Sequence, residues 1–263
     1  MIKIFTVDAF TDVPFRGNPA AVCLPEKNLD ENLMQKIAFE MNLSETAFVV
    51  KKEDGFSLRW FTPESEVELC GHATLASAHI LWQENYLGKN ETAVFHTVYK
   101  GILKADCNQD GIILDFPVNT PQKSNEVPEL SEALGIKPKT VMTTEDHYLA
   151  ELNSGDEVKN IQPDFALLKK LPKFGIIITA ASGSDKYDFI SRFFAPKKGI
   201  DEDPVTGSAH CVLAPYWSEK LAKNSLVAFQ ASKRGGILSL TLKNDRVMIA
   251  GKAVTIMSGI LNL

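Results

Sequence analysis

Short apolar runs with strand-like patterning fill much of the first third of the chain. They occur at residues 4–10, 20–25, 46–52, 56–62, 94–99, 102–107 and 112–118. Two segments place their apolar residues at helical spacing instead: residues 31–42, with Asp30 as candidate N-cap, and residues 71–85. The second of these is apolar or small on nearly every face, which is typical of a helix surrounded by protein. The pattern predicts short, mainly hairpin-connected strands and one enclosed helix.

The second part of the chain repeats the first. RWFTP at residue 59 corresponds to RFFAP at residue 192, and an acidic loop follows each. A glycine then opens a helix of small residues, at Gly71 and again at Gly207. A phenylalanine six residues ahead of a glycine comes next, at Phe95 and at Phe229. The offset between the copies stays within 133 to 136 residues, far above the period of a solenoid. The repeat therefore predicts two similar lobes.

The polar segment 119–130 is the candidate linker between them. We expect an N-terminal lobe of residues 1–118 and a C-terminal lobe of residues 119–263, with the last strand free to return to the N-terminal lobe. Each lobe is expected to be a mainly antiparallel sheet rolled around its central helix, which is an α+β fold. Pro215, inside the second helix, is expected to kink or shorten it.

Composition excludes several classes of function. Formal net charge is −5, and no segment concentrates Lys and Arg, so nucleic acid is not an expected partner. The apolar run at residues 175–181 is too short for a bilayer, and residues 1–10 lack the apolar stretch of a signal peptide, so we expect a cytoplasmic protein with no membrane partner. The four cysteines are widely spaced, which favours free thiols. The five histidines are scattered, so no structural metal site is predicted.

The matched helix starts suggest an anion site. A helix N-terminus offers backbone N–H groups and a partial positive charge, and two of them suit a carboxylate. Gly71 and Gly207 would let the backbone come close to such a ligand. The alternative is that both glycines only permit tight packing.

Acid–base candidates lie beside these starts. Asp203 precedes a proline, Ser208 lies at the second helix start, and His72 occupies the corresponding place in the first, where the positive helix end favours a neutral imidazole. Glu45 opens a strand after the helix 31–42. By residue type alone, a solvated strand-edge glutamate is the commoner situation.

Cys70 directly precedes Gly71, and its counterpart before Gly207 is Thr206. A two-base racemase needs a base on each face of the carbon, and a threonine hydroxyl is too weakly acidic for that role. Cys70 is then most simply a packing residue. A Cys70–His72 hydrolase is also disfavoured, because side chains at i and i+2 of a helix point apart.

Several long motifs resemble the PhzF family of phenazine-biosynthesis-like isomerases. They are PFRGNPAAV (14–22), SETAF (44–48), RWFTPESEVELCGHATLASA (59–78) and EDPVTGSAH (202–210). The family is similar in fold to diaminopimelate epimerase and proline racemase. The resemblance implies a homodimer and a site between the lobes. It implies Glu45 as the principal acid/base, with His72, Asp203 and Ser208 completing the group and Asn18 near the substrate; an ordinary Asn-Pro turn is the alternative for Asn18.

These observations lead to one functional hypothesis. A small carboxylate substrate docks on the N–H groups near His72 and Ala73 and near Gly207 and Ser208, and Glu45 moves a proton on it without metal or other cofactor. The alternatives are a non-catalytic anion-binding protein and a racemase-like or epimerase-like enzyme that uses Cys70.

Overall fold

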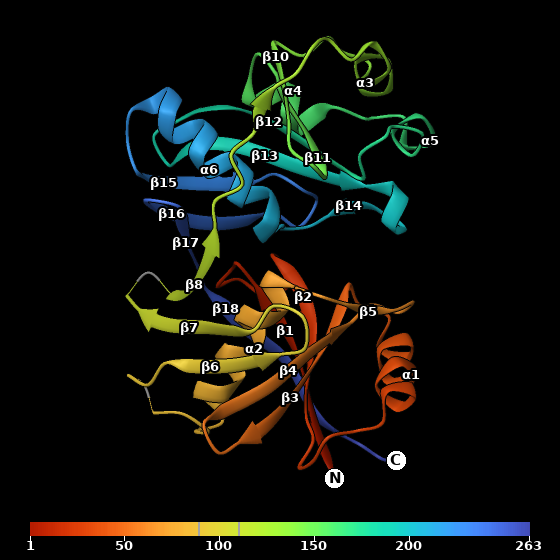
Figure 1. Ribbon diagram of the computed structural model, residues 1–263, viewed down its shortest axis with the longest axis vertical. Coiled ribbons are helices and arrows are strands. Elements are labelled where there is room, and N and C mark those ends of the chain that lie inside the picture. The colour runs from red at the N-terminus through yellow and green to blue at the C-terminus, as the bar shows by residue number, and fades with distance from the viewer. Residues whose placement is uncertain (89, 110) are drawn as a thin grey trace. The chain divides into compact units, whose positions relative to one another are not determined.

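A computed structural model describes residues 1–88, 90–109 and 111–263 of the chain (Figure 1). It contains two compact units: residues 1–115 with 249–263 form unit 1, and residues 116–248 form unit 2. The chain leaves unit 1 within β8 (Gly111–Pro117) and returns to it within β17 (Arg246–Gly251). Across the part of the chain that the structure describes, no helix has the length and apolar character that crossing a bilayer requires.

Unit 1 is a mixed sheet around one helix. Antiparallel pairs join β1 to β2 and to β18, β3 to β4, and β6 to β7, whereas β2–β3 and β4–β6 are parallel. The enclosed helix is α2 (Gly71–Gln83), which packs against β1, β2, β3 and β18. The strands are β1 (Ile2–Ala9), β2 (Asn18–Leu24), β3 (Glu45–Lys52), β4 (Gly55–Phe61), β5 (Glu66–Val67), β6 (Ala93–Thr97), β7 (Ile102–Asn108), β8 and β18 (Ala253–Leu261).

The two helices of unit 1 differ in how much of their surface is buried. In α2, residues 72–78 are all buried, and alanines, serine and threonine let the surrounding strands approach closely. By contrast, α1 (Glu31–Met41) is amphipathic and buries Met34, Ile37 and Ala38. The carboxylate of Asp30 accepts the Asn32 N–H and caps α1, as expected. The enclosed helix predicted from the sequence is therefore α2.

Unit 2 repeats this plan. Its central helix α6 (Gly207–Leu221) packs against β15 and β16, and residues 209–214 are buried. The other helices are α3 (Pro128–Leu134), α4 (Gly155–Asn160), α5 (Phe165–Leu168) and the 3₁₀ turn η1 (Pro196–Lys198). The strands are β9 (Gln122–Lys123), β10 (Thr140–Thr143), β11 (His147–Glu151), β12 (Gly175–Ser184), β13 (Tyr187–Ala195), β14 (Ile200–Asp203), β15 (Ser225–Gln230) and β16 (Gly236–Lys243).

Strand pairing follows the same order in both units. The pairs β1–β2, β2–β3, β3–β4, β4–β5, β4–β6 and β6–β7 correspond to β10–β11, β11–β12, β12–β13, β13–β14, β13–β15 and β15–β16. Parallel pairing falls at the second and fifth places of each series. The central helix lies in the connection that makes the second parallel pair. This confirms the predicted α+β fold and its internal duplication.

The expectation that Pro215 shortens the second helix is wrong, because α6 continues past it to Leu221. A proline has no N–H to donate to the carbonyl four residues earlier, which here belongs to Cys211. That carbonyl instead accepts the N–H of Asn119, at 3.1 Å. The segment 119–130, expected to be a linker, thus supplies a hydrogen-bond donor to a free carbonyl of α6. It also contains β9 and the start of α3.

An arginine–glutamate clamp occupies the same place in each unit. Arg59 of β4 binds Glu66 of β5 through two hydrogen bonds, of 2.6 and 2.7 Å. Arg192 of β13 binds Glu202 of β14 in the same way, at 2.7 and 3.0 Å. Each guanidinium also lies over a phenylalanine two residues further along its strand. The clamps fix the strands β5 and β14, which lead directly into the starts of α2 and α6.

The two clamps are expected to differ in their contribution to stability. The Arg192 side chain is 8% exposed, against 25% for Arg59, and it also donates to the carbonyl of Ile161. Arg192→Met should lower the free energy of unfolding by about 3–5 kcal/mol, since it removes a buried guanidinium and leaves both the partly buried Glu202 carboxylate and the Ile161 carbonyl without their donor. The matched variant Arg59→Met should cost about 1 kcal/mol. Urea unfolding curves measure both, and equal losses would contradict this ranking.

Candidate active site

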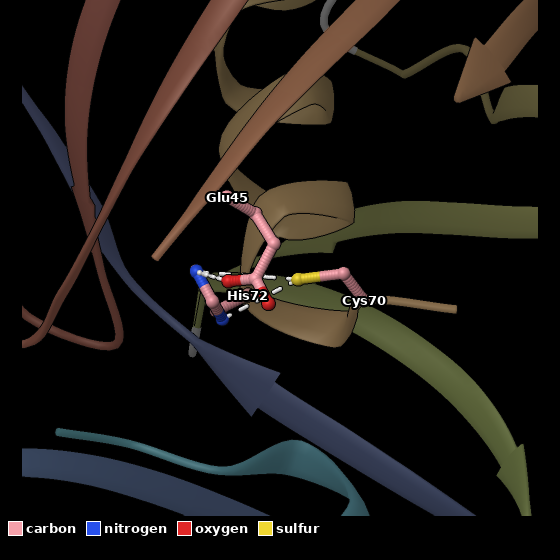
Figure 2. A group of neighbouring side chains, drawn as sticks. All are labelled: Glu45, Cys70 and His72. Carbon is pink, nitrogen blue, oxygen red and sulfur yellow. Dashed lines mark hydrogen bonds and ion pairs between the residues drawn. The ribbon is translucent and has the colours of Figure 1, made fainter. Parts of the chain in front are cut away.

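Glu45 and His72 meet at the start of α2 (Figure 2). Glu45 is the first residue of β3, and His72 is the second residue of α2. Glu45 Oε2 lies 3.1 Å from His72 Nε2, and the two side chains are 14% and 7% exposed. The solvated strand-edge glutamate that residue type alone favours is thus not what the structure contains. A nearly buried carboxylate in contact with an imidazole can exchange protons with it and with a ligand.

Asn18 lies against the other side of the imidazole ring. It is fully buried at the start of β2, and its Nδ2 is 3.1 Å from His72 Nδ1. Its amide can donate to a neutral ring or, turned over, accept from a charged one. The turn before it requires glycine: Gly17 has φ +66°, and a Cβ there would lie 2.1 Å from the carbonyl oxygen of Ala9. Asn18 therefore holds the ring with Nε2 toward Glu45.

Cys70 is also in contact with His72. Its Sγ lies 3.5 Å from Nδ1 and 4.0 Å from Nε2 (Figure 2). The expectation that these two side chains point apart is wrong, because it applies inside a helix. Cys70 is the N-cap of α2, with extended backbone angles of φ −141° and ψ 110°. This extended residue turns its sulfur back over the first helical turn.

The charge state of the cluster follows from its contacts. Burial, and then the charge of Glu45, raise the pKa of Cys70 to about 11, so it is a thiol at neutral pH. Burial opposes a charged His72, but the neighbouring Cys70 and Glu45 outweigh it and raise the pKa of His72 well above its usual range. The helix end favours a neutral imidazole, whereas the Glu45 carboxylate 3.1 Å away favours the charged form.

The start of α6 carries a different group. Thr206 is the N-cap, and the carboxylate of Asp203 accepts a hydrogen bond from its hydroxyl. The side chain of Gln230 in β15 joins them, accepting the Thr206 N–H at 2.9 Å and donating to the Asp203 carbonyl at 2.7 Å. Gly207 is buried at the first helical position, whereas Ser208 is exposed in the first turn.

The residues singled out from the sequence thus fall into two groups. In unit 1 the structure brings Asn18, Glu45 and His72 together beside Gly71 and Ala73 at the start of α2. In unit 2 it places Asp203, Gly207 and Ser208 at the start of α6. Gln230 was missed, since a glutamine inside a strand carries no signal of its own. The contact of Cys70 was missed for the geometric reason given above. Glu45, Cys70 and His72 also each offer an atom of a kind that binds metal ions.

Comparisons with known proteins agree with the fold. A model of the phenazine biosynthesis-like (PhzC-PhzF) family matches residues 7–259. An uncharacterized isomerase of Halalkalibacterium halodurans is 52% identical over 255 residues, covering 97% of this chain and 96% of that protein. A crystal structure of a PhzF family protein from Enterococcus faecalis is 43% identical with a TM-score of 0.95, covering 100% of this chain and 99% of that one.

A more distant likeness supports the fold alone. A probable proline racemase from Agrobacterium radiobacter has a TM-score of 0.63 at 10% identity, covering 100% of this chain and 93% of that one. Fold and relatives together define an isomerase-type enzyme with an epimerase-like fold. The chain belongs to the phenazine biosynthesis-like family.

We expect Glu45→Gln to lower the pKa of His72, because the substitution removes the carboxylate charge that retains the imidazole proton and keeps the side-chain shape. A histidine-detected NMR titration measures this, with His210 of unit 2 as the internal control. Burial lowers the pKa of His210 to about 4, and that value should not move. An unchanged titration of His72 would show that Glu45 does not set its charge.

Cys70 should resist alkylation at pH 8. Its side chain is buried and its pKa is raised to about 11, whereas Cys107 is exposed. Iodoacetamide labelling followed by peptide mass spectrometry should therefore modify Cys107 first and leave Cys70 largely intact. Rapid labelling of Cys70 would indicate a reactive thiol and would favour the cysteine-based alternatives.

Proposed function

We propose that the chain is a cofactor-independent isomerase that moves a proton on a small carboxylate-bearing substrate, with Glu45 as the general acid/base. The observation that carries the proposal is the nearly buried Glu45 carboxylate, 3.1 Å from His72 at the start of an enclosed helix. Such a carboxylate can take a proton from a carbon whose C–H bond is weakened by conjugation.

His72 assists Glu45 in this proton transfer. Glu45 first acts as a carboxylate base, and the imidazole 3.1 Å away can stabilise its negative charge. Once Glu45 has taken the substrate proton, it is a neutral acid and can return that proton to a different atom of the substrate. The pair can thus serve as base in one half of the reaction and as acid in the other.

Substrate binding is assigned to the helix starts. The N–H groups of Gly71, His72 and Ala73 belong to the first turn of α2, where backbone donors and the helix dipole favour an anion. Gly207 and Ser208 hold the equivalent positions in α6. In this proposal, Ser208 and Asp203 bind the same substrate and assist the return of the proton.

A thiol mechanism of the racemase kind is the second candidate, because Cys70 Sγ lies 3.5 Å from His72 Nδ1. Two observations favour Glu45 over it. The raised pKa of Cys70 keeps it protonated, and its counterpart at the start of α6 is the weakly acidic Thr206. A homodimer, as the family resemblance suggests, and a cytoplasmic location, as the sequence pattern suggests, are part of the proposal.

Glu45→Gln should reduce turnover by about 10²–10⁴-fold, the usual contribution of a positioned acid/base. The assay is incorporation of deuterium from heavy water into small cyclic carboxylates, selected first by thermal shift with the wild-type chain. Asp203→Asn should reduce exchange less, and Cys107→Ser should leave it unchanged.

Two results would contradict the proposal. Nearly full exchange by Glu45→Gln would remove Glu45 from the role. A wild-type chain that binds the selected acids without exchanging any hydrogen would indicate a non-catalytic anion-binding protein.

A further inference from the structure

Three different metal-ligating groups converge at the start of α2. The thiol of Cys70, the imidazole of His72 and the carboxylate of Glu45 each offer one ligand atom, and these atoms all lie within 4.8 Å of one another (Figure 2). Thiolate and imidazole are the ligands that Zn²⁺ and its softer relatives favour, and a carboxylate completes many such sets.

The spacing of these atoms suits a four-coordinate ion. With bonds of ~2.3 Å to sulfur and ~2.0–2.2 Å to nitrogen and oxygen, tetrahedral ligand atoms lie about 3.3–3.6 Å apart. Here Glu45 Oε2 is 3.1 Å and Cys70 Sγ is 4.0 Å from His72 Nε2. Ligation through Nε2 requires the Cys70 side chain to rotate, because its Sγ now lies nearer to Nδ1, at 3.5 Å.

A second observation concerns Glu45 alone. Within the described residues its Oε2 is buried and makes no hydrogen bond, although it lies 3.1 Å from the imidazole nitrogen. That oxygen and the ring nitrogen are close enough to share a cation, and the oxygen has a lone pair that no hydrogen bond occupies.

The charges of the ligands suit a divalent cation. A cation held by the Cys70 thiolate and the Glu45 carboxylate meets two negative charges, and the imidazole of His72 binds it as a neutral ligand. Binding displaces the proton of the Cys70 thiol to solvent. The ion and its three ligands are then neutral together, which suits a nearly buried site.

We propose that Cys70 Sγ, His72 Nε2 and Glu45 Oε2 bind one thiophilic divalent cation, with Zn²⁺ as the test ion and water in the fourth position. Asn18 supports the set, since its amide oxygen can accept the Nδ1–H of a ring that ligates through Nε2. This last point rests on the proposed function: an ion bound to the Glu45 carboxylate would block the general acid/base and reversibly inhibit the enzyme.

The test begins with chain freed of metal by a chelator. Calorimetric titration with Zn²⁺ should show one site per chain, and Co²⁺ should produce a thiolate-to-metal charge-transfer band. Cys70→Ser should abolish that band and weaken Zn²⁺ binding at least ~10-fold, because serine is a poor ligand for a soft ion. Glu45→Gln should also weaken binding, and the exposed Cys107→Ser should not.

Mg²⁺ should not compete, since it prefers an all-oxygen site. Absence of Zn²⁺ binding would overturn the inference, as would binding that is equally strong in Cys70→Ser, which would mark an adventitious surface site. The Zn²⁺ measurements need no substrate, so they test the metal site separately from the proposed isomerase function. If the chain binds no Zn²⁺ but Glu45→Gln loses hydrogen exchange, only the metal site is contradicted. If Zn²⁺ binds in a Cys70-dependent way but Glu45→Gln exchanges hydrogen normally, only the proposed function is contradicted.

Discussion

Burial of a helix on every face is the constraint on which each unit depends. A helix made of small and apolar residues cannot lie on the surface of a sheet with one side in water, so the strands must surround it. Its N-terminus is where its backbone N–H groups lack helical partners, and a chain that encloses the rest of the helix leaves that end for polar chemistry. In unit 1, Glu45, Cys70 and His72 gather at that end. The enclosed helix thus determines both the fold and the place of the site.

The two helix starts show how one scaffold can carry unlike chemistry. The clamps Arg59–Glu66 and Arg192–Glu202 hold equivalent strands with nearly the same geometry. Past the clamps, the units diverge. Unit 1 has a carboxylate, an imidazole and a thiol in contact, whereas unit 2 has Asp203 bonded to a threonine hydroxyl. The parts that position the helices are duplicated, and the groups able to move protons are not.

Much of this could be predicted from the sequence, because local periodicity and order along the chain carry the information. The enclosed helices, the duplication and the placing of Glu45 and His72 as candidates all came from such patterns, together with the family motifs. Properties that depend on contacts between residues far apart in the chain, or on the backbone conformation of a single residue, could not be predicted. The charge of His72 depends on a carboxylate 27 positions away in the chain, and the contact of Cys70 depends on one extended residue. The helix α6 tolerates Pro215 because the backbone N–H of Asn119 donates to the carbonyl that the proline leaves without a partner.

The pairing of β1 with β18 has a consequence for how the chain is made. Unit 2 is continuous in sequence, so all of it has been synthesised before the final strand exists. Residues 2–9, by contrast, form hydrogen-bonded pairs with residues 253–261. Until residues 253–261 have been synthesised, the edge of β1 that receives β18 has no strand beside it, and an open strand edge invites pairing with other chains. The sheet of unit 1 therefore stays incomplete while all of unit 2 is synthesised, and β18 completes it.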